Sequence, residues 1–153
     1  MSVSKVAAMP GKIDYETDVV AWSREQARWL KAGRFDQLDL EHLAEEIEDV
    51  GKSEQRELAN RMAVLLVHLI KWQHQPGLRG ASWEITIRNQ RKGIIRRLGK
   101  TPSLKSELQD ADWWESLWED ATAQAAQETG LSSFPECCPW SSGQVLGLDW
   151  LPA

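Results

Sequence analysis

The sequence has few of the residues that most often carry chemistry in a small protein. Among 153 residues it has two cysteines, three histidines and one tyrosine. Cys137 and Cys138 are adjacent, so they form no disulfide framework, and no second pair exists to complete a zinc site. A redox-active vicinal dithiol is one interpretation of the pair. The simpler one is two small, partly buried thiols in a reducing compartment.

The chain also lacks a long apolar run. The longest, from Met62 to Ile70, is interrupted by His68 and is far too short to cross a bilayer. The first residues show no apolar core followed by a cleavage pattern, so they predict no signal peptide. We therefore expect a cytoplasmic protein without a membrane partner.

Motifs of common catalytic sites are missing as well. There is no glycine-rich phosphate loop, no G-x-S-x-G and no H-E-x-x-H. A di-iron bundle needs paired Glu-x-x-His elements, and the nearest pattern is Asp39-x-x-His42. His42, Glu46 and Asp49 could form part of a metal site with His68, but a solvated acidic face explains them more simply. We predict no metal and no cofactor.

The composition is that of an ordinary soluble domain. Hydrophobic residues make up 42% and charged residues 27%, in a length that fits one domain. The net charge of −5 argues against general affinity for nucleic acid or anionic membranes.

Apolar residues recur at helical spacing, and no segment alternates convincingly as a strand would. Helices are predicted over residues 18–32, 40–50, 53–74, 82–100 and 102–129, the last with a kink near Asp110. The predicted fold class is all-α, a single-domain bundle of about five mostly antiparallel helices. Residues 1–13 are predicted to be a disordered leader and residues 14–153 a single helical domain.

Caps, stops and core faces follow from the same pattern. The predicted caps are Thr17 or Asp18, then Asp39, Ser53, Ser82 and Thr101, and the predicted stops are Gly33, Gly51 and Gly130. One predicted core stripe holds Leu40, Leu43, Ile47 and Val50. The next holds Leu58, Met62, Leu65, Leu66, Leu69 and Trp72.

The tail, residues 131–153, is rich in Pro, Gly and Ser but contains Phe134, Trp140 and Trp150. Disordered segments seldom carry that much aromatic surface. We therefore predict an aromatic tail packed on the bundle, with a short helix near Gln144.

Segment 82–100 carries six basic residues against one acidic residue. On a helical projection, Arg91 falls on the buried stripe between Ile87 and Ile94. The other basic residues are spread around the helix, whereas a DNA-reading helix gathers its polar groups opposite the core. The pattern thus argues against a nucleic-acid partner. The candidate basic surface is Arg88, Lys92, Arg96 and Arg97.

Two acidic segments elsewhere in the chain have the opposite charge to segment 82–100. Residues 36–57 hold nine acids and two bases, a net charge of −7, and residues 107–128 hold seven acids and no base. Segment 82–100 has a net charge of +5. Charge complementarity inside the bundle explains this pattern without a partner.

An inward arginine needs a partner, because an unpaired buried charge costs several kcal/mol. Glu46 is the predicted partner of Arg91, and His68 occupies a similar boundary position. An interior polar cluster of this kind either fixes helix register or forms a site. The candidate polar cluster is Glu46, His68, Trp72, Gln90 and Arg91.

Several segments, taken in order, resemble a bacterial family called domain of unknown function 29. They include "YETDVVAWSREQARWL", "LLVHLIKWQHQP", "SWEITIRNQR" and "FPECCPW". The resemblance covers roughly residues 15–152 and implies an all-helical fold, without an activity to carry over. The matching positions are Glu46, Glu48, Gly51, His68, Trp72, Trp83, Arg88, Arg91, Cys138, Pro139 and Trp140. Cys137 and Gly93 depart from the family pattern.

Three functions are consistent with these features. The first is a small helical protein without catalysis that acts through a protein partner or self-association. The second is a regulatory or mobile-element protein that touches nucleic acid through the basic helix at residues 82–98. The third is an enzyme or ligand-binding protein with its site at Glu46, His68 and Arg91.

Overall fold

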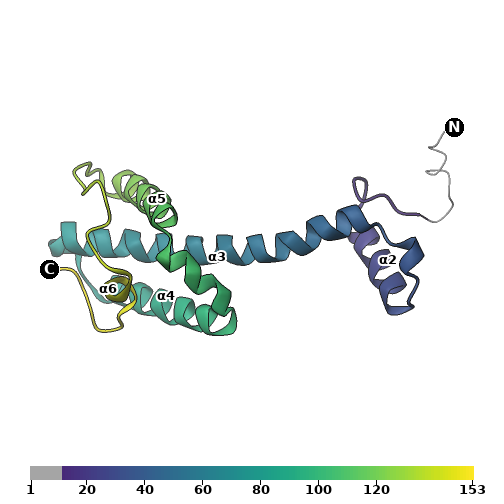
Figure 1. The fold of residues 1–153 in the computed structure, drawn as a ribbon. Coiled ribbons are helices and arrows are strands. Elements are labelled where there is room, and N and C mark those ends of the chain that lie inside the picture. The colour runs from purple at the N-terminus through teal and green to yellow at the C-terminus, as the bar shows by residue number, and fades with distance from the viewer. Residues whose placement is uncertain (1–11) are drawn as a thin grey trace. The chain divides into compact units, whose positions relative to one another are not determined.

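The computed structural model describes residues 12–153, and within that range the chain is helical and contains no strand (Figure 1). The predicted all-α fold is therefore confirmed. Residues 1–11 of the predicted leader lie outside the described residues. The elements are α2 (Val19–Lys31), η1 (Phe35–Gln37), α3 (Leu40–His74), η2 (Pro76–Leu78), α4 (Ala81–Lys100), η3 (Pro102–Gln109), α5 (Ala111–Thr129) and α6 (Ser142–Leu146), where η is a 3₁₀ helix.

The chain divides into two compact units, Met1–Lys52 and Ser53–Ala153, with the boundary inside α3. We call them unit 1 and unit 2 and describe each by itself. That residues 14–153 form a single domain stays a prediction. No helix among the described residues is both long and apolar enough to cross a membrane.

Several predicted helix ends are confirmed. Asp18 caps α2 by accepting a hydrogen bond from the Ala21 backbone N–H at 3.0 Å. Gly33 and Gly130 have φ of 74° and 78°, a left-handed conformation that glycine adopts readily at the end of a helix. The predicted kink near Asp110 is a break, because η3 ends there and Asp110 caps α5.

Two predicted boundaries are wrong. Residues 40–50 and 53–74 form the single helix α3. Gly51 has no positive φ, and a helical glycine costs only about 1 kcal/mol relative to alanine. Ser53 therefore lies inside the helix and is not a cap. Ser82 is not a cap either, because α4 begins at Ala81 after an extended Gly80. Thr101 precedes η3, but its side chain makes no capping hydrogen bond.

Unit 2 contains a continuous hydrophobic core. In Figure 1, α4 and α5 flank the part of α3 that belongs to this unit. The predicted α3 face is buried, with Leu58, Met62, Leu65, Leu66 and Leu69 all 0% exposed. Ile87 and Ile94 of α4 and Leu117 and Trp118 of α5 complete the core.

The aromatic tail packs on this core, as predicted. Trp140 meets Trp118 and Trp150 edge-on, with ring centroids 5.6 and 5.7 Å apart. The short helix expected near Gln144 is α6, which begins with a capping box between Ser141 and Gln144. Its Val145 is fully buried.

Unit 1 has a much smaller core. Among its described residues, Trp22 is the one buried apolar side chain, accompanied by Glu25 and Gln26. The predicted core stripe on the first turns of α3 is wrong, because Leu40, Ile47 and Val50 are 70%, 70% and 67% exposed. The reason is that Tyr15 and Trp22 contact polar side chains of α3 and its cap, which leaves the apolar stripe uncovered.

Candidate functional site

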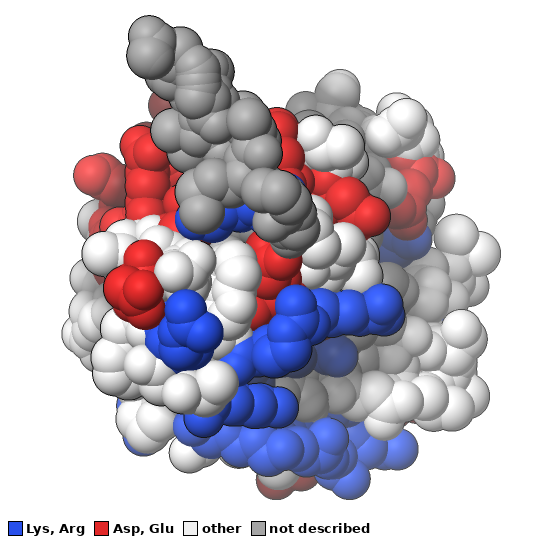
Figure 2. Space-filling model, turned by 90° about the vertical axis from the view of Figure 1, so that its right-hand side faces the viewer, with Lys and Arg blue, Asp and Glu red and all other residues white. Residues whose placement is uncertain are grey.

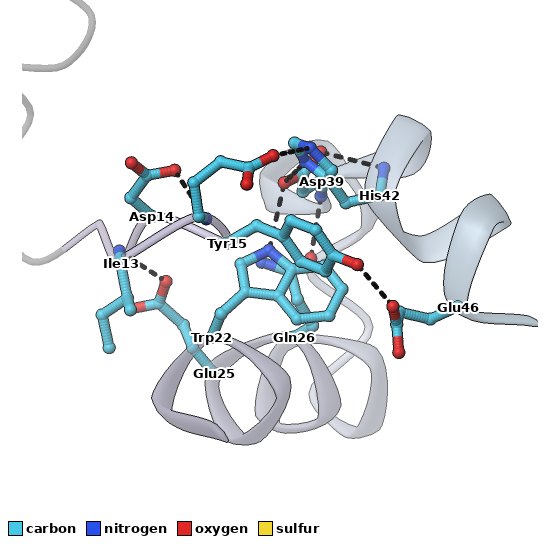
Figure 3. Close-up of polar contacts among 10 residues, drawn as sticks. Ile13, Asp14, Tyr15, Trp22, Glu25, Gln26, Asp39, His42 and Glu46 are labelled. Atoms are coloured by element: carbon cyan, nitrogen blue, oxygen red, sulfur yellow. Dashed lines mark hydrogen bonds and ion pairs between the residues drawn. The ribbon is translucent and has the colours of Figure 1, made fainter. Parts of the chain in front are cut away.

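A polar cluster of unit 1 surrounds a group of three rings (Figure 3). Tyr15 and His42 lie nearly parallel, with centroids 4.1 Å apart and planes at 16°. Trp22 meets Tyr15 edge-on at 4.7 Å and His42 edge-on at 6.3 Å. The three rings come from the segment before α2, from α2 itself and from the first turn of α3.

Asp39, the residue before α3, lies at the centre of the hydrogen bonds. Its Oδ2 accepts from Trp22 Nε1 at 3.0 Å and contacts His42 Nδ1 at 2.7 Å. Its Oδ1 accepts from the His42 backbone N–H at 3.4 Å, the expected capping contact. The Asp39 N–H donates to Gln26 Oε1 at 2.8 Å. One carboxylate thus begins α3 and ties α2 to it.

Glu46 completes the cluster one turn further along α3. The Tyr15 hydroxyl donates to Glu46 Oε2 at 2.5 Å. This hydrogen bond to a carboxylate raises the pKa of Tyr15 to about 12. The contact holds the Tyr15 side chain against the first turns of α3.

Both nitrogens of His42 face carboxylates. Nδ1 contacts Asp39, and Nε2 lies 3.7 Å from Glu16 Oε2. The hydrogen bond to Asp39 raises the pKa of His42. Burial acts to raise the pKa of Asp39, but the hydrogen bonds from His42 and Trp22 outweigh it and lower that pKa. Both pKa shifts favour the charged forms of Asp39 and His42, as expected for an ion pair.

No three His, Cys, Asp or Glu side chains within residues 12–153 are grouped so that they could hold a metal ion. In the metal half-site considered from the sequence (His42, Glu46 and Asp49), two side chains make other contacts. His42 bonds Asp39, and Glu46 bonds Tyr15.

Arg91 is buried, as predicted, at 1% exposure. Its partner is not the predicted one. Arg91 Nε donates to the Val145 carbonyl at 2.8 Å, and Nη2 donates to the Gln144 carbonyl at 3.4 Å. Both carbonyls belong to α6, so Arg91 caps a helix end in the tail. A helical projection of α4 cannot show a backbone acceptor that lies 54 residues away.

The structure does not bring the candidate polar cluster together. His68 is partly exposed and contacts the Val64 carbonyl of its own helix at 2.8 Å. The Trp72 ring lies under the Arg79 guanidinium, 5.1 Å from the ring centroid. Gln90 is partly buried, and its Oε1 finds no partner among the described residues. No hydrogen bond in the described chain joins two members of the predicted cluster.

The candidate basic surface is divided between two hollows. Lys92, Arg96 and Arg97 line a groove with Glu54 and other residues of α3 and α4. Arg88 lines a smaller hollow that includes Arg91. Figure 2 shows one face of the molecule, with Lys and Arg side chains in blue and Asp and Glu side chains in red.

The expected complementarity between charged segments is partly present. Arg97 Nη1 lies 2.7 Å from Glu54 Oε1, and Arg97 Nη2 lies 3.8 Å from Glu57 Oε2. These pairs join the basic segment to the acidic one at residues 36–57. The acidic segment at residues 107–128 instead pairs with α3, through Glu128 and Lys71.

Sequence reasoning missed Tyr15, Trp22 and Asp39 as a group. The pattern Asp39-x-x-His42 was the available signal, because an aspartate cap places its second oxygen near a side chain three residues later. Nothing in the local spacing shows that Tyr15 and Trp22 reach that cap.

A family model, described as a domain of unknown function, DUF29, matches residues 15–151. That range includes every helix of the described chain. No curated protein and no solved structure matches the sequence.

Proposed function

We propose that this chain, which belongs to the domain of unknown function family DUF29, is a protein–protein interaction module without catalytic activity. The observation that supports the proposal is the exposed apolar stripe on α3. We call Leu40, Leu43, Ile47 and Val50 the α3 stripe; three of the four are at least two-thirds exposed.

The spacing of the α3 stripe is that of a helix-pairing seam. Its members follow the i, i+3, i+7, i+10 pattern of alternate a and d positions over two heptads. At helical spacing, Ala44 and Gly51 fall on the flank of the stripe opposite Glu46, and both are small enough to let another helix approach closely. An amphipathic helix laid along this seam would cover the stripe.

The charge around the α3 stripe selects a basic partner. Residues 36–57 carry a net charge of −7. A field of that sign accelerates the association of a positively charged helix and opposes one of the same sign. A second copy of this chain would bring two such acidic segments together. The proposed partner is therefore an amphipathic helix of a different protein, with basic residues beside its apolar face.

The test is a binding titration with a synthetic amphipathic peptide that has leucine at its a and d positions and lysine outside them. The full chain should bind it with a negative heat-capacity change, because apolar surface is buried. Ile47→Asp should weaken binding at least about tenfold, the effect of removing a central apolar contact. Raising the salt concentration should weaken binding too.

The matched control is Ile95→Asp, which makes the same change at an isoleucine of unit 2 that is 44% exposed. It should leave peptide binding unchanged. Equal losses at Ile47 and Ile95 would show non-specific apolar contact and refute the proposal. Sedimentation of the chain alone should show a monomer. A dimer that Ile47→Asp dissociates would make a second copy the partner instead.

A further inference from the structure

A basic groove in unit 2 is not used by the proposed function. It lies between α3 and the second half of α4 and encloses about 710 Å³. Five of its lining residues are basic and one is acidic. They are Glu54, Arg61, Asn89, Lys92, Gly93, Arg96, Arg97, Lys100 and Thr101.

Two of the arginines are held in place by glutamates of α3. Arg97 pairs with Glu54 at 2.7 Å and with Glu57 at 3.8 Å. Arg61 Nε lies 3.0 Å from Glu57 Oε2. These contacts fix two planar guanidinium groups at the wall of the groove. Such groups match the oxygens of phosphate in pairs.

The other three cations are exposed and have no ion pair within the described residues. They are Lys92, Arg96 and Lys100. After Glu54 and Glu57 are counted against Arg61 and Arg97, these three leave the groove with a net positive charge. A surface that served only internal complementarity would not need them. They favour an anionic ligand with more than one charge.

Gly93 shapes the floor of the groove. A Cβ at this position would lie 3.2 Å from Arg61 Nη1, closer than ordinary contact. Glycine thus lets the Arg61 guanidinium rest against α4, although glycine in a helix interior costs about 1 kcal/mol relative to alanine.

We infer that the groove binds a small ligand carrying two or more phosphate groups. The volume suits a compact molecule. No aromatic side chain lines the groove, so it offers no platform on which the bases of a single-stranded nucleic acid could stack. Glu54 in the lining and Glu57 beside it interrupt the continuous positive track that a long phosphate backbone would follow. The groove therefore recognises phosphate groups of a small molecule.

The experiment is calorimetric titration of the full chain with inorganic triphosphate, inorganic phosphate and a mixed-sequence oligonucleotide. Triphosphate should bind at least about tenfold more tightly than phosphate, because it meets several cations at once. Lys92→Ala with Arg96→Ala should weaken triphosphate binding at least about tenfold. Triphosphate should also raise the melting temperature of the wild type and not that of the double variant.

The matched control is Arg88→Ala, which removes one positive charge from the same helix outside the groove. It should change triphosphate affinity less than about twofold, as a distant exposed charge does. Gly93→Ala, which pushes Arg61 from α4, should weaken binding while the chain stays folded. Equal losses with Arg88→Ala and with Arg96→Ala alone would overturn the inference. So would an oligonucleotide that binds more tightly than triphosphate, because the ligand would then be nucleic acid.

Discussion

At the scale of single residues, Arg91 shows how a buried cation can rely on the backbone. Its recorded partners are the carbonyls of Gln144 and Val145, and no carboxylate pairs with it among the described residues. Burial lowers the pKa of Arg91, but an arginine stays charged at any physiological pH. The charge is therefore retained inside the protein at the end of α6.

Arg91→Ala should lower the free energy of unfolding by about 2–4 kcal/mol. The change leaves a buried carbonyl without a donor and opens a cavity. Lys92→Ala, at the exposed neighbouring position, should cost less than about 0.5 kcal/mol. Urea denaturation of the two variants beside the wild type measures both values. Similar small effects at the two positions would mean that the Val145 contact contributes little.

The correction of the Arg91 partner can be tested separately. Glu46 bonds Tyr15 and shares no recorded partner with Arg91. The effects of Arg91→Ala and Glu46→Ala on unfolding should therefore add to within about 0.5 kcal/mol. A coupling energy well above that value would restore the pairing expected from the sequence.

His42 should titrate above the ordinary pKa of 6.5, because its hydrogen bond to Asp39 favours the imidazolium. An NMR titration of the ring protons measures this directly. Asp39→Asn keeps a capping oxygen but removes the negative charge. In that variant the pKa of His42 should fall toward its ordinary value. An unchanged pKa in the variant would assign the shift to other carboxylates.

The same two groups give stability a pH window. A raised pKa of His42 means that its stabilising effect is complete below pH 6.5 and is lost as the pH rises through the folded-state value. A lowered pKa of Asp39 means the reverse: its effect is complete above pH 3.8 and is lost as the pH falls through the folded-state value. The Asp39–His42 contribution should thus be greatest between these two values.

At the scale of elements, α3 continues through Gly51, the residue at which the sequence predicted that a helix ends. A Cβ at Gly51 would meet no atom within 4 Å, and the backbone there is helical. Gly51→Ala should therefore stabilise the chain by about 0.5–1 kcal/mol through helix propensity. Thermal denaturation followed by far-ultraviolet circular dichroism measures the gain.

Gly93→Ala provides the matched comparison, because it makes the same substitution inside α4. The new methyl group would press on Arg61 at 3.2 Å. Its gain should accordingly be smaller than that of Gly51→Ala. A larger gain at Gly93 would show that Arg61 moves aside at no cost.

The sequence predicts much at this scale, and its errors have identifiable causes. Apolar spacing located the α3 face at Leu58 and the α4 face at Arg91, because a buried face imposes a helical period. The stop at Gly51 failed because glycine permits a left-handed turn without requiring one. The stripe at Ile47 was assigned to the core because spacing identifies an apolar face but not whether the chain itself covers it.

The site was less accessible to sequence reasoning than the fold. Arg91 was recognised as interior, but its acceptor is a carbonyl, and every residue has one. The Tyr15 contact to Glu46 depends on how the chain before α2 folds back, over 31 residues. Contacts of this range follow from tertiary packing and leave no mark in local spacing.

At the scale of the whole molecule, the two units differ in how much they bury. Among the described residues, unit 1 buries one apolar side chain, Trp22, whereas unit 2 buries an extensive core. Local opening needs less free energy where few apolar contacts are lost. Hydrogen exchange should therefore be fast in residues 12–52 and slow in residues 58–70 and 87–98. Equal protection of both units would show that they open together, as the predicted single domain implies.

The Arg91–Val145 hydrogen bond also has a kinetic consequence. It joins residues 54 positions apart, whereas helical turns join residues four positions apart. Contacts between distant residues form slowly, because the chain loses loop entropy before it gains the contact. Refolding of unit 2 should thus be limited by the docking of α6, with helix forming before the tail closes. Arg91→Ala should then slow folding as well as speed unfolding, as expected for a contact that forms in the rate-limiting step.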